Sequence, residues 1–373
     1  MSPETDVVVI GAGVVGLACA AALARDGRSV VTVERNAALA QETTARSSEV
    51  VHAGIYYPPG SLKAALCVAG REALYARCER LGISHRRTGK LIVATREDEV
   101  AELESLRARG TDNGAPGLEL IDADAVRRRE PCVRARAALF SPASGIVDAH
   151  ALCLSYAAEA EAAGALFAYR RRVVAIEFGG GGFAVRARSP EDALESLTCT
   201  AVVNAGGLES DRLAALAGID VDGRGYRLHL CKGDYFSLAP GAPVRVAGLV
   251  YPVPSGPGLG IHATVDLAGR VRFGPDAEYV DRVRYDVDPA KAPRFAAAVQ
   301  RYLPELDARW LAPDFAGVRP RLATPQERFR DFVIAEESAA GLPGLVNLIG
   351  IESPGLTAAP AIAERVVQLL RAR

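Results

Sequence analysis

Three glycines near the start of the chain have the spacing that binds the phosphates of a dinucleotide. They follow an apolar run at residues 7–10 in GxGxxG order and are Gly11, Gly13 and Gly16. A helical Ala/Leu run comes next, and a second apolar run at residues 30–33 ends at Glu34. The glycines permit a tight turn, close approach of the backbone to a pyrophosphate and close packing of helix on strand. The helix N-terminus favours the phosphates, and Glu34 is expected to accept hydrogen bonds from the ribose.

Residues 7–24 carry no charge, so a membrane span and a signal peptide are alternative interpretations of this stretch. The residues before it, Glu4 and Asp6, are acidic rather than basic, and a strand-type segment changes to a helical one within it. A membrane-spanning helix does not need a change from strand-type to helix-type residues within it. We therefore expect no transmembrane segment.

The composition is that of an ordinary globular protein that binds neither nucleic acid nor metal. The 373 residues are 49% apolar and 24% charged, and a net charge of −1 argues against a basic footprint for nucleic acid. Seven cysteines without a CxxC pair favour reduced thiols and a cytoplasmic location, with peripheral contact to a membrane left open. Five histidines without an HExxH motif or a Cys/His cluster predict no metal site.

Further strand and helix signals lie along the chain. Apolar runs at residues 200–204 and 345–350 are typical of buried strands. A helix is expected at residues 97–109, closed by Gly110. Residues 221–312 are rich in proline and alternating patterns, which predict a mostly antiparallel sheet.

These elements predict an α/β fold of two domains, each assembled from separate parts of the chain. A Rossmann-like domain is expected to hold the nucleotide-binding segments, and a second α+β domain, built on the mostly antiparallel sheet, is expected to bind the substrate. The first domain is expected at residues 1–82, 146–220 and 317–373, and the second at residues 83–145 and 221–316.

Several longer segments, spread over nearly the whole chain, occur in a recognisable order. They are residues 51–64 (VHAGIYYPPGSLKA), 231–236 (CKGDYF), 251–254 (YPVP), 259–262 (LGIH) and 316–319 (AGVR). With the GxGxxG start, this order resembles the D-amino-acid oxidase-like superfamily of FAD-dependent oxidoreductases, and within it the L-2-hydroxyglutarate dehydrogenase/oxidase family. The first segment is the most specific, because GxGxxG alone indicates only a dinucleotide.

The resemblance implies FAD, with its isoalloxazine ring between the two domains. The loop at residues 43–48 would offer hydroxyls and Arg46, the backbone at 205–207 could pass close to the cofactor, and 350–357 would open the final helix toward the flavin. A solvated loop and an ordinary helix entry are the alternatives for the first and last of these. The residues assigned to the cofactor are Gly11, Gly13, Val14, Val15, Gly16, Glu34, Arg35, Thr44, Arg46, Ser47, Ser48, Val173, Ala205, Gly206, Gly350, Ser353, Pro354, Gly355, Leu356 and Thr357.

Oxidation of a 2-hydroxy acid needs hydride transfer from Cα to flavin N5 and a base for the hydroxyl proton. A histidine, with an ordinary pKa of about 6.5, suits that role. The resemblance favours His262 as the base and His52 as a neighbour of the flavin. A purely structural histidine is the alternative for each of them.

A carboxylate substrate also requires cationic or hydrogen-bonding side chains. Arg319 is the first candidate, because arginine grips a carboxylate through two nitrogens, and Lys232 is the second. Tyr251 and Tyr56 would supply hydroxyl groups. A position at the surface or between the domains is the alternative for all four.

These expectations predict an enzyme that oxidises a small 2-hydroxy acid, with L-2-hydroxyglutarate as the leading candidate, to the 2-oxo acid. An FAD-dependent amine or amino-acid oxidase of the glycine or D-amino-acid oxidase type is the alternative, and a non-catalytic flavoprotein is a third. The electrons would pass to oxygen, a quinone or a carrier protein. The sequence leaves that acceptor, the stereochemistry and the oligomeric state open.

Overall fold

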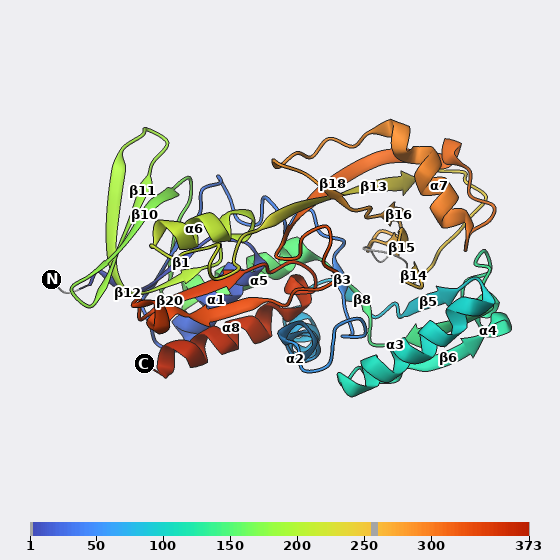
Figure 1. Cartoon of the computed structure of the whole chain (residues 1–373), viewed down its shortest axis with the longest axis horizontal. Helices are drawn as coiled ribbons and strands as arrows, with labels where there is room; N and C mark the ends of the chain where they lie inside the picture. The colour runs from blue at the N-terminus through green and yellow to red at the C-terminus, as the bar shows by residue number, and fades with distance from the viewer. Residues whose placement is uncertain (1–2, 255–259, 373) are drawn as a thin grey trace.

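The computed structural model describes residues 3–254 and 260–372, which form two large sheets and one small one (Figure 1). Leu259 of the LGIH segment lies outside the described residues. The first large sheet has eight strands: β1 Thr5–Ile10, β2 Val30–Val33, β9 Leu166–Ala168, β10 Arg172–Gly179, β11 Gly182–Arg188, β12 Leu194–Asn204, β19 Val333–Glu336 and β20 Leu345–Ile349. The small sheet consists of β3 Val50–Val51, β4 His85–Arg86 and β8 Gly145–Val147.

The centre of the first sheet is parallel and joins distant parts of the chain. β1 lies between β2 and β12, and β12 pairs in turn with β20 near the C-terminus. In Figure 1 the blue start, the green middle and the red end of the chain accordingly lie side by side. A parallel strand needs a crossover connection, so one such sheet collects segments that are far apart in sequence.

Helices cover this sheet and bury the start of the chain. They are α1 Val14–Arg25, α2 Leu62–Leu81, α5 Ala149–Ala162, α6 Ser210–Leu216 and α8 Gly355–Arg371. α1 packs against α5 and α8, and its only charged residue is the last one, Arg25. A helix that is apolar all round must be covered on several sides. This packing explains why residues 7–24 carry no charge although they form a strand and a helix of a globular core.

The second large sheet is mostly antiparallel, as predicted. Its strands are β5 Lys90–Ala94, β6 Glu119–Asp122, β7 Ala137–Ser141, β13 His229–Leu238, β14 Leu249–Pro252, β15 His262–Val265, β16 Val271–Gly274, β17 Glu278–Tyr279 and β18 Leu311–Arg321. Among the described strands of this sheet, only β5 and β14 pair in parallel. The helices on this side are α3 Val100–Asp112, α4 Ala123–Arg129 and α7 Ala292–Gln300. Phe295 of α7 packs with Phe236 and Phe273 in the core beneath the sheet.

Two sequence expectations about element ends differ from the structure. Gly110 does not close α3 but lies inside it, where an added Cβ would come within 2.5 Å of Leu118 Cδ1. The glycine therefore serves close packing, and the helix ends at Asp112 with Asn113 as its cap. The domain boundary expected at residue 317 falls within β18, which stays paired with β13 up to Arg321.

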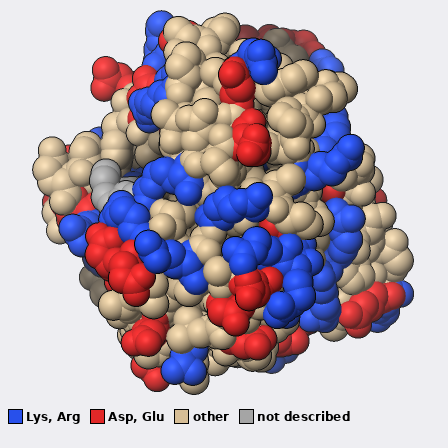
Figure 2. Space-filling view, turned by 90° about the vertical axis from the view of Figure 1, so that its right-hand side faces the viewer, with Lys and Arg blue, Asp and Glu red and all other residues tan. Residues whose placement is uncertain are grey.

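The face seen in Figure 2 carries acidic and basic side chains together, with several Lys and Arg side chains across its middle. Arginines of the second sheet's helices are paired with nearby acids. Arg127 bridges Asp124 on α4, and Arg301, just after α7, bridges the buried Glu99 before α3. An exposed pair such as Arg127–Asp124 is worth at most about 1 kcal/mol. We therefore read these side chains as a solvated face.

Candidate active site

The turn between β1 and α1 has room for backbone only. Gly11 has a φ of +104°, and a Cβ built there would lie 2.5 Å from the carbonyl oxygen of Ala205. A Cβ on Gly16 would lie 1.9 Å from the carbonyl oxygen of Gly11. Gly13 is the N-cap of α1 and forms no side-chain cap. Gly11 thus makes the tight turn and Gly16 the close packing of helix on strand that their spacing predicts, while the approach of the Gly13 backbone to a pyrophosphate stays a prediction.

A cavity of about 290 Å³ runs from this turn to the second sheet. The β1–α1 turn, the loop after β2, the start of α6 and the start of α8 line it from the first sheet's side, and β13, β14, β15 and β18 line it from the other. Most residues assigned to the cofactor line this cavity. They are Gly11, Gly13, Val14, Val15, Gly16, Glu34, Arg35, Thr44, Arg46, Ser47, Ser48, Val173, Ala205, Gly206, Ser353, Pro354, Gly355 and Leu356.

Two assigned residues, Gly350 and Thr357, do not line the cavity. Gly350 follows β20 with a φ of +71°, and a Cβ there would lie 2.6 Å from the side chain of Leu322, so its role is a tight turn. Thr357 is buried within α8, and its Oγ1 accepts a hydrogen bond of 3.0 Å from the backbone N–H of His52. Thr357 therefore positions a cavity residue and does not itself face the cavity.

Polar groups gather at the dinucleotide end. The two oxygens of Glu34 accept hydrogen bonds from the N–H groups of Ala12 (2.7 Å) and Asn36 (2.8 Å), which fixes the carboxylate at the end of β2. Thr44 Oγ1 accepts a 3.1 Å hydrogen bond from the N–H of Val14, the first residue of α1. Arg35 forms ion pairs with Glu42 and Glu209. The end of the cavity is therefore rigid and polar.

The start of α8 reaches the cavity without a capping side chain. Its N-cap, Pro354, makes no side-chain cap, so the first N–H groups of the helix are not taken by that residue. Ser353, just before it, places its Oγ 3.2 Å from Nε2 of His52. The positive end of the α8 dipole consequently lies where negative charge in the cavity would be stabilised.

One face of the second sheet supplies the other wall of the cavity. Val250 and Ala263 are cross-strand partners, so Tyr251 and His262 are also neighbours, and their rings stack at 3.5 Å with an angle of 7°. His262 is 6% exposed and Tyr251 is 2% exposed. Burial raises the pKa of Tyr251 well above its usual value, so its hydroxyl stays protonated.

His52 approaches this wall from the segment after β3. Burial lowers the pKa of His52 well below its usual value, and the neighbouring Lys90 and His262 lower it further. Its imidazole is therefore neutral at neutral pH. Its Nδ1 is buried and has no hydrogen-bond partner among the described residues.

The two candidates for binding a carboxylate, Arg319 and Lys232, lie in different surroundings. Arg319 lines the cavity, and its Nη2 donates to the carbonyl oxygen of Asp276 at 2.9 Å. The same Nη2 also lies 3.3 Å from Cys231 Sγ. Lys232 is 1% exposed and does not line the cavity. On β13 its neighbours Gly233 and Tyr235 line the cavity, and strand alternation turns Lys232 to the opposite face.

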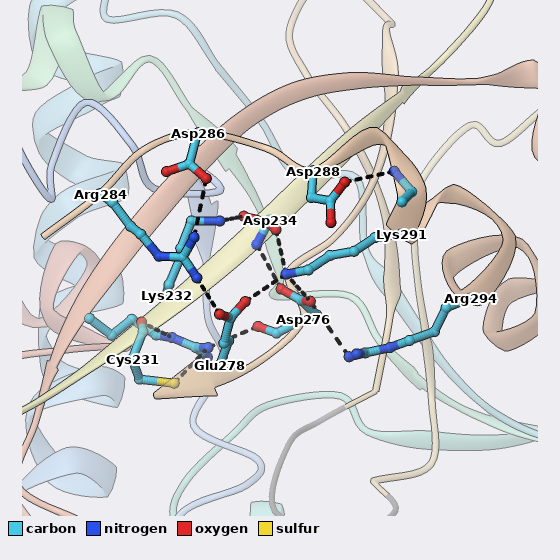
Figure 3. Close-up of polar contacts among 12 residues, drawn as sticks. Cys231, Lys232, Asp234, Asp276, Glu278, Arg284, Asp286, Asp288, Lys291 and Arg294 are labelled. Atoms are coloured by element: carbon cyan, nitrogen blue, oxygen red, sulfur yellow. Dashed lines mark hydrogen bonds and ion pairs between the residues drawn. The ribbon is translucent and has the colours of Figure 1, made fainter. Parts of the chain in front are cut away.

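Lys232 instead belongs to a buried ion cluster (Figure 3). It pairs with Asp234, while Lys291 contacts Asp234 at 2.6 Å, Asp276 at 3.1 Å and Glu278 at 2.8 Å. These acids raise the pKa of Lys291, although burial opposes them. The cluster connects β13, β17 and the entry to α7, which gives Lys232 a structural role.

Two further residues of this region need comment. Tyr56 does not line the cavity, but its ring lies near Lys90, and its buried hydroxyl lacks a hydrogen-bond partner among the described residues. Lys90 itself was absent from the sequence-based assignment. The sequence did contain a signal for it, because Lys90 is the single charged residue of the apolar strand KLIVA. A charge that is buried with such a strand is costly, which indicates a specific role.

Among residues 3–254 and 260–372, no group of His, Cys, Asp and Glu side chains could hold a metal ion. Within the same residues, no helix has the length and apolar character required to cross a bilayer. All seven cysteines are free thiols, and six of them are buried.

Comparison with known proteins agrees with this geometry. Residues 6–369 match the family described as FAD dependent oxidoreductase. The mitochondrial L-2-hydroxyglutarate dehydrogenase of Arabidopsis thaliana is 40% identical, over 97% of this chain and 83% of that protein. The L-2-hydroxyglutarate dehydrogenase of Escherichia coli K12 is 29% identical, over 97% and 92%. The structure of L-alpha-glycerophosphate oxidase from Mycoplasma pneumoniae with FAD bound superimposes with a TM-score of 0.87 at 27% identity, covering 98% of this chain and 94% of that chain.

Proposed function

Because this chain belongs to the FAD-dependent oxidoreductase family, with FAD as its cofactor, we propose that it oxidises L-2-hydroxyglutarate to 2-oxoglutarate. The observation that carries the proposal is one cavity that joins the Gly11 turn to His52 and His262. Relatives named L-2-hydroxyglutarate dehydrogenase match the chain over nearly its whole length. This match supports the choice of substrate within the family.

The residues of the cavity fit FAD. Gly11 and Gly16 leave no space for a side chain at the turn, and the N-cap Gly13 leaves the start of α1 without a capping side chain of its own, although Thr44 accepts from the N–H of Val14. Glu34 is held at the end of β2, where the ribose of a dinucleotide binds. At the other end, the uncapped start of α8 and the unpartnered Nδ1 of His52 are polar groups that a flavin ring could satisfy.

Bound FAD supplies an acceptor for the hydride that leaves the substrate Cα. The chain must orient the substrate and take its hydroxyl proton. We assign the second role to His262, because its ring is held by stacking on Tyr251 and it lines the cavity. We assign His52 to contact with the cofactor, because Ser353 holds it beside the start of α8. Arg319 is our candidate for the carboxylate next to the reacting carbon.

Anaerobic reduction of the purified yellow protein tests this function. L-2-hydroxyglutarate should bleach the visible flavin absorbance, and the D isomer should do so far more slowly. Glycine and D-amino acids test the alternative of an amine oxidase. Bleaching by an amino acid but by no 2-hydroxy acid would contradict the proposal, and so would a flavin that no small acid reduces.

The electrons must then pass to oxygen, a quinone or a carrier protein. Hydrogen peroxide formation in air, compared with reduction of a soluble quinone, would separate the first two acceptors from a carrier protein. Seven free thiols support a reducing compartment such as the cytoplasm. Fractionation of cells that contain the protein would test that location and any peripheral contact with a membrane.

A further inference from the structure

Lys90 is a buried cation that does not itself line the cavity but packs against Tyr251, which does. It begins β5, and 1% of its surface is exposed. Its Nζ lies 4.2 Å from the centre of the Tyr251 ring and 5.4 Å from that of Tyr56. The register of β5 with β14 and of β14 with β15 places Lys90, Tyr251 and His262 on the same face of the sheet. Lys90 is therefore a neighbour of the residues that we assign to the reaction.

No carboxylate accompanies this ammonium group in the described part of the chain. The other three lysines of the sequence all have one: Lys63 pairs with Glu352 at 2.9 Å, Lys232 with Asp234, and Lys291 with three acids. Beside Lys90 lie two tyrosine rings, with Cys67 and His52 as further neighbours, and none of these is a carboxylate. The buried hydroxyl of Tyr56 also lacks a partner among the described residues.

An unpaired buried charge is costly, so a protein that retains one usually pairs it with a ligand. Desolvation is the main cause that lowers the pKa of Lys90 to about 7. An anion that reached Lys90 from the cavity, past the Tyr251 ring, would restore the charged form and accept a hydrogen bond from it. The Tyr56 hydroxyl could donate to the same anion.

The order of the strands indicates which part of an acid would reach Lys90. In the order β18–β13–β16–β15–β14–β5, the strand of His262 lies between those of Arg319 and Lys90. Adjacent strands are roughly 4.8 Å apart, so β5 lies about 10 Å from β15. The cationic side chains of Arg319 and Lys90 thus approach the reacting position from opposite sides.

We propose that Lys90 is the specificity-determining residue that binds the distal carboxylate of a dicarboxylate substrate, with the Tyr56 hydroxyl as a second donor. The inference rests on the proposed function and specifies it further. It explains why a short 2-hydroxy dicarboxylate would be preferred to a monocarboxylate of the same length. Without Lys90, the distal carboxylate would be buried against tyrosine rings with no charge to meet it.

Equilibrium binding tests the contact without any turnover. Glutarate and valerate have the same number of carbons but differ by the distal carboxylate, and calorimetry on the FAD-loaded protein gives both affinities. In Lys90→Met the affinity for glutarate should fall roughly 10- to 100-fold, as loss of a charged hydrogen bond implies. The affinity for valerate should change less than threefold, and Lys90→Arg should keep most of the preference for glutarate.

Lys63→Met is the control, since it removes a buried lysine that already has its own carboxylate, Glu352, and this carboxylate, which lines the cavity, keeps Arg321 as a second partner. It should leave the ratio of the two affinities unchanged. Steady-state rates with 2-hydroxyglutarate and 2-hydroxyvalerate should show the same pattern, with the change in KM rather than kcat. An unchanged ratio in a folded, yellow Lys90→Met protein would overturn the inference while the proposed reaction could still stand.

The unmodified protein offers a second measurement. Because the pKa of Lys90 is about 7 without ligand, the affinity for glutarate should be constant below pH 7 and fall above it. The expected slope is at most about tenfold per pH unit. Cys67 and His52 also face this lysine, but their pKa values lie at about 12 and well below the usual histidine value. Burial raises the pKa values of the nearby Tyr56 and Tyr251. His262 would face both ligands, so its effect should be the same for valerate, which therefore serves as the reference ligand. Parallel curves for glutarate and valerate would contradict a role for Lys90.

Discussion

At the scale of single residues, two histidines face one cavity in different surroundings. The backbone N–H of His52 donates to Thr357, and its ring is within hydrogen-bond distance of Ser353. Burial holds the pKa of His52 well below its usual value. His262 is held by a stacked tyrosine on the opposite wall. A neutral, fixed His52 suits contact with a cofactor, whereas His262 is placed to exchange a proton with a substrate.

We therefore expect His262→Ala to lower kcat for the 2-hydroxy acid by roughly 10²- to 10⁴-fold, as removal of a general base does. FAD content should be unaffected. Anaerobic stopped-flow bleaching at saturating substrate measures this loss directly. The comparison is His52→Ala, which should weaken FAD retention more than it slows the reaction. A loss of only a few-fold in His262→Ala would mean that another group takes the proton.

At the scale of elements, the approach of α1 to β1 depends on the absence of side chains. A Cβ on Gly16 would lie 1.9 Å from the Gly11 carbonyl oxygen, so the helix would have to shift. The start of α1 and the turn before it form the end of the cavity where we propose that the phosphates of FAD bind. A shift of the helix would therefore move the N–H groups to which we assign that contact.

Gly16→Ala should consequently lower FAD occupancy of the purified protein by about tenfold or more, since one lost charge-assisted contact is already worth that much. The ratio of flavin to protein absorbance measures occupancy. Gly179→Ala is the control, because a Cβ at Gly179 meets nothing within 4 Å. Full occupancy in Gly16→Ala would show that the turn adapts and that its close packing is not required for FAD.

At the scale of the whole molecule, the cavity is closed by contacts between its two walls. Arg46, in the loop after β2, donates through Nη1 to the carbonyl oxygen of Ala316 on β18 at 3.3 Å. Its guanidinium also lies 3.8 Å from the centre of the Tyr285 ring. A Cβ on Gly317 would lie 2.5 Å from the carbonyl oxygen of Arg46, so the loop and β18 are in close contact.

Arg46→Ala should therefore speed the release of FAD by roughly fivefold to tenfold, because it removes a hydrogen bond and a cation–π contact. Tyr285→Ala should have a smaller effect in the same direction. The recovery of free-flavin fluorescence after dilution measures the rate. Arg284→Ala is a suitable comparison, since Arg284 binds Glu278 and Asp286 instead. Equal release rates in all three variants would show that the contacts of Arg46 with Ala316 and Tyr285 do not retain the cofactor.

The sequence by itself determined what depends on neighbouring residues. The GxGxxG turn, the apolar strands and the antiparallel character of residues 221–312 follow from local spacing, so these predictions agree with the structure. The resemblance to FAD-dependent oxidoreductases was equally visible, because HAGIYYPPG and its companion segments are continuous in the chain. Most of the residues assigned to the cofactor line the cavity for the same reason.

Only the tertiary structure decided which side chains meet. The register of β14 with β15 creates the Tyr251–His262 stack, and strand alternation turns Lys232 toward Asp234 and away from the cavity. Lys90 gains its importance from strands more than 150 residues away, since β5 pairs with β14. Burial and pairing between distant strands set these environments, and neither is contained in the local pattern of residues.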